Sequence, residues 1–445
     1  MADNLSRRDV IRMFGAAGLA SGMGLSARSA TGQTPPARPA AATLSAGKVI
    51  QPQRELPVLS ETDVLIVGGG PAGVAAALAA RRLGVRVTIA ERYGHFGGQW
   101  TGGLVLLLDG CYAKGPVLVT RGIGEEMCQR LEKMDRGIIN REPGKNATVD
   151  AEALKYLMVD MLTAAEVEVF LHSWCADAVV EGNAVRGAVF ESKSGRQAIL
   201  AKMVVDASGD GDVYAAAGAE FEFMRYHIGL VHRLGNLDKV DKAKAAEFLK
   251  QADPKKRKLL TGGPTPIEGV NWVNMRGPDS NAIDVKELSR LELAHRKQIW
   301  NQVEQLRKTP GYEPVYLAET APQLGVRMSR LLKGLAKLTW QGFKDERTWP
   351  DVIGVGGAWK GDHQSWQIPY GALVPEKVDN ILAAGRCISI EPKMADLVRV
   401  IPPCWVTGQA AGAAAALAVQ GNCRPRDVAV PKLQEVLKQQ GAYLG

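Results

Sequence analysis

Three glycines and one acid near the start of the chain have the types and the spacing that hold a nucleotide pyrophosphate. Gly68, Gly70 and Gly73 form a G-x-G-x-x-G run, and Glu91 follows at the distance where a ribose-binding acid belongs. The first glycine allows a sharp turn, and the second lets backbone approach a phosphate. A carboxylate at Glu91 accepts hydrogen bonds from both ribose hydroxyls. The pattern predicts a dinucleotide site, and the alternative is a glycine-rich turn beside a buried or solvated Glu91.

The segments around these residues predict the elements that must position them. Residues 64–67 are a short β-branched strand, the glycines open a helix, and a second strand ends at Glu91. The helix N-terminus offers N–H groups and a positive dipole to a phosphate. Further on, the patterns indicate a helix, several strands and a buried strand, at residues 150–165, 167–172, 176–180, 184–191, 197–200 and 203–207.

The chain changes character between residues 220 and 375, where Lys, Arg, Trp and long helical patterns become frequent. We therefore expect an α/β fold in which residues 61–219 and 376–445 form a Rossmann-like domain, with a parallel sheet and an antiparallel β-meander. Residues 220–375 are expected to form an inserted α+β substrate or cap lobe. The strongest helices are predicted at residues 285–308, 404–419 and 431–440, and a short strand at 380–384.

The N-terminal residues 1–30 predict an export signal that is removed from the mature protein. The run Ser6-Arg7-Arg8-Asp9-Val10-Ile11-Arg12 and the weakly apolar stretch after it are similar to a twin-arginine signal, with Val10 where Phe is usual. A periplasmic or otherwise exported location and the twin-arginine translocation machinery as a partner follow from this reading; the alternative is a disordered basic arm. Residues 31–60 read as a Pro/Ala-rich linker.

Composition excludes several classes of function. The 445 residues carry a formal net charge of +8, but the basic run at residues 255–258 is expected to be a solvated face rather than a nucleic-acid site. The six cysteines form no C-x-x-C pair and no Cys/His cluster with metal spacing, so we predict no metal site. No run of eighteen apolar residues occurs, so we expect no transmembrane segment in the mature chain.

Several ordered motifs together give a family resemblance that extends over about residues 61–444. The chain resembles the bacterial FAD-dependent oxidoreductases of the glutathione-reductase-like superfamily. The resemblance is carried by Ala207-Ser208-Gly209-Asp210-Gly211-Asp212, Gly325-Val326-Arg327-Met328-Ser329-Arg330, Ile368-Pro369-Tyr370, Gly385-Arg386-Cys387-Ile388-Ser389, Arg399-Val400-Ile401-Pro402-Pro403-Cys404 and Gly408-Gln409-Ala410-Ala411-Gly412.

The resemblance implies FAD as the cofactor and assigns residues to its parts. Glu91 would hold the adenosine ribose, Cys175 and Ala176 would lie near the adenine, and Gly385 with Arg386 would close the pyrophosphate side. The complete implied site is Gly68, Gly70, Pro71, Ala72, Gly73, Glu91, Arg92, Gly97, Gly98, Gln99, Cys175, Ala176, Ala207, Gly209, Asp210, Gly385, Arg386, Pro403 and Gly408. The helix that starts near Pro403 would point its dipole at the flavin. The alternative for Gly408 is helix–sheet packing alone.

Three residues are candidates for binding the substrate or for catalysis. His363 precedes the segment that returns to the FAD-binding domain, where it would be a base, a substrate ligand or an ordinary loop residue. Arg327 and Arg330 either clamp a substrate carboxylate or form pairs inside the second lobe. The expected function is an exported dehydrogenase or reductase that moves a hydride between a small organic substrate and flavin N5, with electrons passed to an external acceptor.

Two other functions remain open at this point. Ser365-Trp366-Gln367-Ile368-Pro369 resembles the W-x-W-x-I-P run of flavin halogenases, but Gln364 stands where the first Trp belongs. A flavin-dependent monooxygenase or halogenase-like enzyme is therefore one alternative. The other is a non-catalytic protein that binds flavin for structure.

Overall fold

The computed structural model describes residues 41–113, 117–142, 145–251, 261–357 and 364–445, in two compact units. In the first unit, residues 1–55, the described part holds a hairpin of β1 (Thr43–Ser45) and β2 (Lys48–Ile50). The second unit is residues 56–445. The export signal predicted at residues 1–30 lies outside the described residues. The predicted linker, residues 31–60, includes this hairpin and the start of the next strand.

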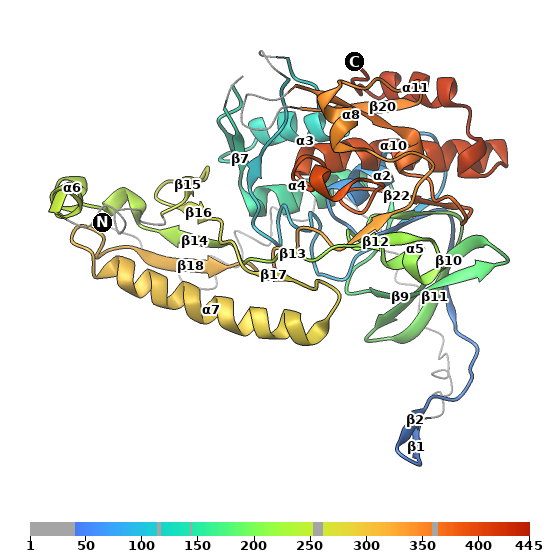
Figure 1. The fold of residues 1–445 in the computed structure, drawn as a ribbon, viewed down its shortest axis with the longest axis horizontal. Helices are drawn as coiled ribbons and strands as arrows, with labels where there is room; N and C mark the ends of the chain where they lie inside the picture. The colour runs from blue at the N-terminus through green and yellow to red at the C-terminus, as the bar shows by residue number, and fades with distance from the viewer. Residues whose placement is uncertain (1–40, 114–116, 143–144, 252–260, 358–363) are drawn as a thin grey trace, which may run out of the picture. The chain divides into compact units, whose positions relative to one another are not determined.

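A parallel sheet forms the centre of the second unit (Figure 1). Its parallel strands are β3 (Val58–Val67), β4 (Val87–Ala90), β8 (Glu168–Phe170), β11 (Gly195–Asp206) and β22 (Ile381–Ala383). They lie in the order β8-β4-β3-β11, with β22 also paired to β11. The side chains of residues 64–67 and 87–90 are buried on both faces of the sheet, which explains their continuous apolar sequence.

The antiparallel meander is part of the same sheet. β9 (Trp174–Glu181) pairs with β10 (Ala184–Ser192), and β10 pairs with the first half of β11. The prediction of two separate strands at 197–200 and 203–207 was wrong. β11 runs unbroken through Ala201 and Lys202 because its other edge stays paired with β3. The predicted fold class, α/β with a Rossmann-like sheet and a meander, is confirmed.

Two helices of small residues pack tightly against each other beside this sheet. α2 (Pro71–Arg81) follows the glycine turn, and α10 (Ile401–Gly421) begins three residues before the predicted Cys404. A Cβ atom at Gly408 would lie 2.1 Å from the carbonyl oxygen of Ala72. One at Gly412 would lie 2.0 Å from that of Ala76. Both glycines are therefore needed for the helices to approach, and α10 is fixed against the start of α2.

The other helices of this part of the unit pack on α2, on α10 or on the meander. α4 (Ala151–Ala164) starts where predicted, because the Asp150 carboxylate accepts hydrogen bonds from the backbone N–H groups of Glu152 and Ala153. The others are α3 (Ile123–Glu132), α5 (Asp212–Ala216), α9 (Ala395–Val398) and α11 (Val430–Gln439). A small sheet of β5 (Leu107–Leu108), β7 (Ala147–Val149) and β6 (Ile138–Ile139) lies next to α3 and α4.

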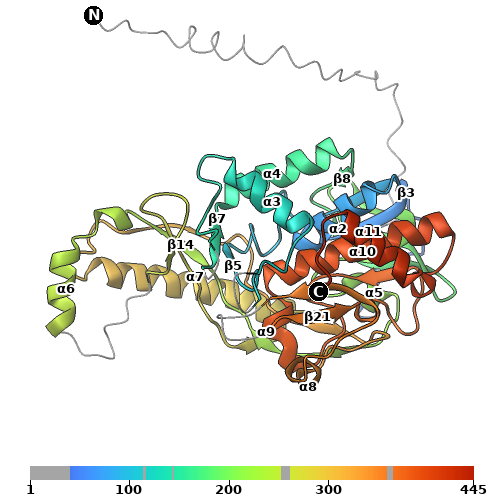
Figure 2. The same ribbon diagram turned by 90° about the horizontal axis from the view of Figure 1, so that it is seen from above.

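Residues 226–320 build a second group of elements. β15 (Gly263–Pro264), β16 (Asn271–Val273), β14 (His232–Gly235) and β18 (Tyr316–Thr320) form a four-stranded antiparallel sheet. Figures 1 and 2 place this sheet beside the long helix α7 (Val285–Arg307) and near α6 (Lys242–Gln251), on one side of the unit. Two short pairs, β13 (Tyr226–His227) with β17 (Asp279–Ser280) and β12 (Phe221–Phe223) with β19 (Arg330–Leu332), connect this group to the rest.

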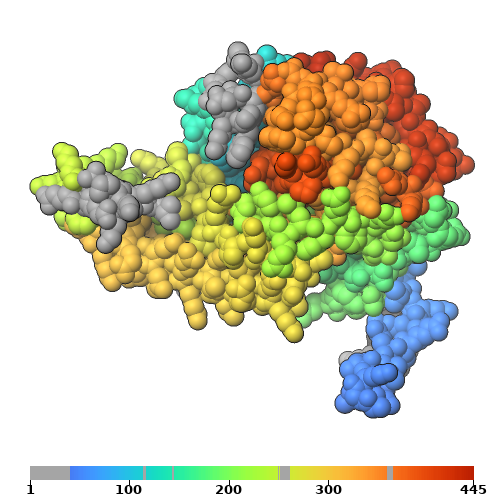
Figure 3. Space-filling model, viewed as in Figure 1, coloured from blue at the N-terminus to red at the C-terminus, as the bar shows by residue number. Residues whose placement is uncertain are grey.

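The elements formed by residues 340–369 lie near α10, the helix beside the parallel sheet. β20 (Val352–Gly356) and β21 (Trp366–Pro369) form a hairpin that packs on α10, near α8 (Trp340–Lys344). On the face seen in Figure 3, residues coloured yellow adjoin these later residues, coloured orange to red. The lobe boundaries at 220 and 375 stay predictions.

Three further observations concern the cysteines, metal sites and membrane-spanning helices. All six cysteines are free thiols. Within the described ranges, no group of His, Cys, Asp or Glu is arranged to hold a metal ion. None of the helices in those ranges combines the length and the apolar character needed to cross a membrane.

Candidate active site

A cavity of about 380 Å³ opens at the carboxyl ends of four parallel strands. Gly68 follows β3, Glu91 follows β4, Ala207 follows β11 and Ala384 follows β22, and all four residues line the cavity. Open α/β sheets bind ligands at this edge, where the strands end and the chain turns into helices. The sheet thus brings Gly68 of the glycine turn and Glu91 to the same place.

The three motif glycines have different reasons to be glycine. Gly68 has a φ of +100°, and a Cβ there would lie 2.4 Å from the carbonyl oxygen of Ala207. A Cβ at Gly73 would lie 1.8 Å from the carbonyl oxygen of Gly68. Gly70 differs, since a Cβ there would have no atom of the protein within 4 Å, and Gly70 lines the cavity. Protein packing therefore requires Gly68 and Gly73, whereas Gly70 keeps space free for a ligand.

Glu91 is buried at the cavity wall and is held by backbone. Its Oε2 accepts a hydrogen bond of 2.6 Å from the N–H of Gly69, and its Oε1 accepts one of 2.9 Å from Tyr93. These bonds fix the carboxylate and leave further lone pairs for ligand hydroxyls. Beside it, the Arg92 guanidinium carbon lies 5.0 Å from the ring centroids of both Tyr93 and Trp174.

A buried ion pair forms the opposite wall. Arg386 Nη2 donates to Asp210 Oδ1 at 2.9 Å, and the Ser329 hydroxyl donates to the same oxygen at 2.6 Å. Burial raises the pKa of Asp210, but Arg386 and the Ser329 hydrogen bond outweigh burial and hold the pKa below its usual value. Arg386 lines the cavity, and among the described residues its buried Nε has no hydrogen-bond partner. A donor is thus left beside the cavity for an acceptor on a ligand.

Residues at the start of α10 form another part of the cavity wall. Val400, Ile401 and Cys404 line it, and Pro402 and Pro403 remove two of the backbone N–H groups of the first turn. The helix dipole at this point therefore acts with few hydrogen-bond donors. Burial raises the pKa of the Cys404 thiol to about 12, so this group is protonated and is not a nucleophile at neutral pH.

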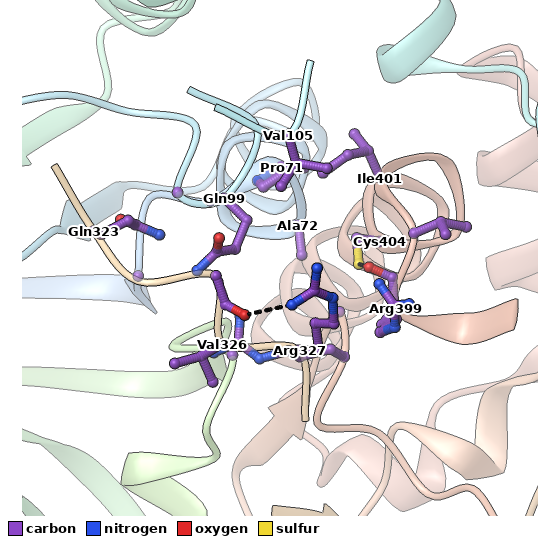
Figure 4. Close-up of a pocket in the computed structure, with 18 of the residues that line it drawn as sticks. Pro71, Ala72, Gln99, Val105, Gln323, Val326, Arg327, Arg399, Ile401 and Cys404 are labelled. Atoms are coloured by element: carbon purple, nitrogen blue, oxygen red, sulfur yellow. Dashed lines mark hydrogen bonds between the residues drawn. The ribbon is translucent and has the colours of Figure 1, made fainter. Parts of the chain in front are cut away.

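The other end of the cavity is polar and is built by several segments that are far apart in the sequence. Its wall includes His227, Val231, Trp272, Asn274, Arg276, Gln323, Gly325, Val326, Arg327, Asp396 and Arg399. Figure 4 shows Gln99, Arg327, Arg399 and Cys404 around this space. These side chains come from β13, the end of β16, the loop before β19 and the end of α9, which are distant in sequence.

His227 is the buried centre of this polar end. Arg276 Nε lies 3.4 Å from His227 Nε2 and donates to it, and Arg327 Nη1 donates to the His227 carbonyl at 3.3 Å. Burial, followed by the charges of Arg327, Arg276 and Arg399, lowers the pKa of His227 to about 4. Its imidazole is therefore neutral at pH 7.

Comparison with known proteins identifies the class of this site. A family described as FAD dependent oxidoreductase matches residues 63–437. The chain belongs to this family. Its cofactor is FAD, and it is an oxidoreductase.

The chain is also similar to parts of two named proteins. It is 30% identical over 158 residues to digeranylgeranylglycerophospholipid reductase 1 of Methanopyrus kandleri, covering 34% of this chain and 40% of that protein. It is 32% identical over 165 residues to 6-methylpretetramide 4-monooxygenase of Streptomyces rimosus, covering 34% and 39%. The chain thus matches only about two fifths of the length of each.

A solved structure is similar along most of the chain. The geranylgeranyl bacteriochlorophyll reductase-like protein of Thermoplasma acidophilum has a TM-score of 0.44 and 15% identity, covering 85% of this chain and 83% of that one.

The residues at the sheet end fit FAD. The open position at Gly70, the fixed carboxylate of Glu91 and the unpartnered Nε of Arg386 suit the pyrophosphate and ribose of this FAD-dependent oxidoreductase. The predicted residues that line the cavity are Gly68, Gly70, Pro71, Ala72, Glu91, Arg92, Gly98, Gln99, Ala207, Gly209, Gly385 and Arg386. Their roles toward FAD stay predictions.

The remaining predicted FAD residues do not line this cavity. Gly97 donates its N–H to the Gly69 carbonyl at 2.7 Å and so supports the turn. Gly408 packs on the backbone of Ala72 in α2, a contact between two helices instead of the helix–sheet packing given as the alternative, and its contact with FAD stays a prediction. Asp210 acts through Arg386, as described above, while Gly73 supports the glycine turn. Cys175 and Ala176 lie in β9 and Pro403 lies inside the first turn of α10, and their contacts with FAD stay predictions.

The catalytic candidates separate into three cases. Arg327 lies in the cavity, as the carboxylate-clamp hypothesis requires. Arg330 does not line it, since its Nη1 donates to the Asp210 carbonyl at 2.9 Å and to Asp212 Oδ1 at 3.0 Å. These partners lie outside the predicted second lobe, so the expected pairing inside that lobe is not what the structure has, and a role of Arg330 toward the substrate stays a prediction. His363 lies outside the described residues.

Sequence reasoning missed most of the polar end. His227, Trp272, Asn274 and Arg276 belong to no motif and stand on short, irregular segments. Their one signal was that basic and aromatic residues become frequent after residue 220, which does not say which of them meet.

Proposed function

We propose that this protein is an exported FAD-dependent oxidoreductase of the dehydrogenase or reductase type. It moves a hydride between a small organic substrate and FAD, and passes the electrons to an external acceptor. The observation that carries the proposal is the single cavity, which joins the glycine turn and Glu91 at one end to His227 and Arg327 at the other. A cofactor held at the first end and a small molecule held at the second are then in direct reach of each other.

When bound, FAD supplies a two-electron carrier. The chain supplies binding, orientation and proton handling. The turn from Gly68 to Gly73 and the buried Arg386 bind the phosphate side, and Glu91 binds a ribose. Trp272, Val326 and Ile401 are apolar parts of the cavity wall that exclude water. His227 is a neutral imidazole at the substrate end, where it holds or takes a proton at a ring nitrogen.

The test is reduction of the bound flavin by substrates without oxygen. The purified protein should contain FAD, and small organic substrates added anaerobically should bleach its visible absorption within the time of catalytic turnover. A purified protein that contains FAD but is bleached only by dithionite, and by no organic substrate, would contradict the proposal. It would favour a flavin kept for structure.

A monooxygenase is the second candidate, because one partial relative is named 6-methylpretetramide 4-monooxygenase. The two functions differ in the fate of oxygen. With ¹⁸O₂ a monooxygenase places one labelled oxygen atom in its product, whereas the proposed dehydrogenase or reductase places none. The label therefore decides between them once a substrate is found.

The export proposal rests on Arg7, Arg8 and the weakly apolar run after them. Twin-arginine export carries folded proteins, which suits a protein that must take up FAD first. The change of both arginines to lysine (Arg7→Lys with Arg8→Lys) should keep the positive charge but retain the protein in the cytoplasm. Export that continues unchanged in this variant would refute the twin-arginine route.

A further inference from the structure

Three arginines converge on one point at the substrate end of the cavity. Arg276 follows β16, Arg327 lies in the loop before β19, and Arg399 follows α9. Arg276 and Arg327 both bond to His227, through its ring and its carbonyl respectively. The Arg399 guanidinium lies 5.9 Å from the Tyr226 ring centroid, and the rings of Tyr226 and His227 are 4.3 Å apart. Three separate segments thus bring their charges to the Tyr226–His227 pair.

The protein neutralises only part of this charge. Asp396 accepts a hydrogen bond of 3.0 Å from Arg399 Nε, and its pKa is held below the usual value as Arg399 outweighs the effect of burial. Burial and the charges of Arg399 and Arg276 lower the pKa of Arg327 to about 10, which shows that its positive charge is poorly compensated. Asp109 also lines the cavity, where it accepts a hydrogen bond from the neutral amide of Asn146 and keeps its own charge. The cluster itself, Arg276, Arg327 and Arg399 with Asp396, carries a formal charge of +2.

The donors of this cluster are partly free. Arg327 uses Nη1 on the carbonyls of His227 and Gly325 and Nη2 on the side chain of Asn274. Among the described residues, no hydrogen bond uses the two terminal nitrogens of Arg276, whose side chain is exposed at the cavity wall. Guanidinium groups bind carboxylates and phosphates through paired N–H donors. Like charges placed together without partners destabilise a fold, so their convergence here indicates a ligand that supplies the missing charge.

We propose that the substrate is a small organic dianion, bound by Arg276, Arg327 and Arg399 at the end of the cavity away from the glycine turn. This inference rests on the proposed function, because it names the substrate class of the same cavity. Two negative charges match the surplus of the cluster, and a single carboxylate would leave one guanidinium uncompensated. A dicarboxylate and a phosphate monoester share this chemistry. Arg276, Arg327 and Arg399 would thus set specificity, and His227 beside them would meet the bound anion.

The test uses the FAD-loaded protein and direct binding. Malonate and phenyl phosphate serve as dianionic probes, and malonamide serves as the neutral match of malonate. We expect at least one of the two dianions to change the visible flavin spectrum on titration. Its affinity should fall as the salt concentration is raised. Malonamide should not bind. The relative affinity of the two dianions shows which of the two chemistries the site prefers.

A matched pair of variants connects the binding to the cluster. Arg276→Gln removes an exposed guanidinium of the cavity wall and should weaken binding of the dianion about 10- to 100-fold, as expected for a charged hydrogen bond. Arg225→Gln makes the same change of charge next to Tyr226, but Arg225 pairs with Glu287 outside the cavity. This control should bind the dianion like the parent protein.

Three results would overturn the inference. Malonamide that binds as tightly as malonate would show that charge is not recognised. Equal losses in Arg276→Gln and Arg225→Gln would show a general electrostatic effect. A loss of FAD affinity in Arg276→Gln, with no change for the dianion, would assign the cluster to the cofactor. If the protein binds FAD and substrates bleach it, but no dianion binds, the inference fails while the proposed function stands; if no substrate bleaches it, the proposed function fails.

Discussion

Replacing Gly70 with alanine should separate the fold from cofactor binding. Gly70 has φ −70° and ψ −175°, a backbone conformation that alanine adopts without strain. Beyond residues 69–71, no described protein atom lies within 4 Å of the position that the new methyl group would occupy. The same position faces the cavity. The methyl group therefore meets nothing in the protein alone and meets the ligand when FAD is bound.

The expected magnitudes follow from this geometry. In the protein without FAD, glycine to alanine at a compatible position stabilises by about 0.4–1 kcal/mol, because the unfolded chain loses freedom. In the complex, the methyl group crowds a close backbone–phosphate contact, and crowding of this size costs about 1–3 kcal/mol. The dissociation constant of FAD should therefore rise about 5- to 150-fold in Gly70→Ala.

The assay combines FAD titration, followed by quenching of flavin fluorescence, with thermal unfolding in the presence and absence of FAD. Gly70→Ala without FAD should unfold at or above the temperature of the parent protein, and should gain less stability from added FAD. Gly421→Ala is the matched control, since its Cβ would lie 3.5 Å from Cys423 Sγ at the far end of α10. This control should bind FAD normally. Unchanged FAD affinity in Gly70→Ala, or loss of its fold, would refute the reasoning.

Further predictions concern packing, the buried ion pair and pH. Gly408→Ala should lower the free energy of unfolding by about 1–3 kcal/mol, because its methyl group would lie 2.1 Å from the Ala72 carbonyl oxygen; an unchanged urea midpoint would contradict this. Asp210→Asn leaves the buried Arg386 without its carboxylate and should cost about 3–5 kcal/mol in urea unfolding, more than Ser329→Ala, which removes only the hydroxyl. Burial and the charges of Arg327, Arg276 and Arg399 lower the pKa of His227 from 6.5 to about 4. Tyr226 and Asp396 also face this side chain. The unfolded chain therefore takes up the His227 proton at a higher pH than the folded protein does. His227 thus stabilises the fold above about pH 6.5, and this contribution is lost as the pH falls toward 4. His227→Gln should flatten the stability curve between these values, and a curve as steep as that of the parent would speak against it; His232, whose pKa burial also lowers to about 4, supplies the remaining slope.

The sheet end could be predicted because its signals are local. Gly68, Gly70 and Gly73 stand within six residues, and Glu91 ends the next strand. Short apolar runs beside such a turn leave few arrangements other than parallel strands joined by a helix. The start of α4 was likewise visible in one capping residue, Asp150.

The substrate end could not be predicted because its parts meet only through the fold. His227, Arg276, Arg327 and Arg399 are separated by dozens of residues, and none of their segments has a periodic pattern that fixes its neighbours. Pairing also changed local expectations. The break expected within β11 is absent because β3 holds it along its length. Gly408 serves helix contact rather than the cavity, because α2 passes directly over it.

We expect one cavity to hold FAD at the glycine turn and a dianionic substrate at the arginines. A crystal structure of the protein with FAD and malonate would show where each of them binds. We predict FAD density against Gly68 and Gly70, with the adenosine ribose at Glu91, and malonate in contact with Arg276, Arg327 and Arg399. FAD bound elsewhere, or FAD phosphates on these three arginines, would show that the cavity is not divided in this way.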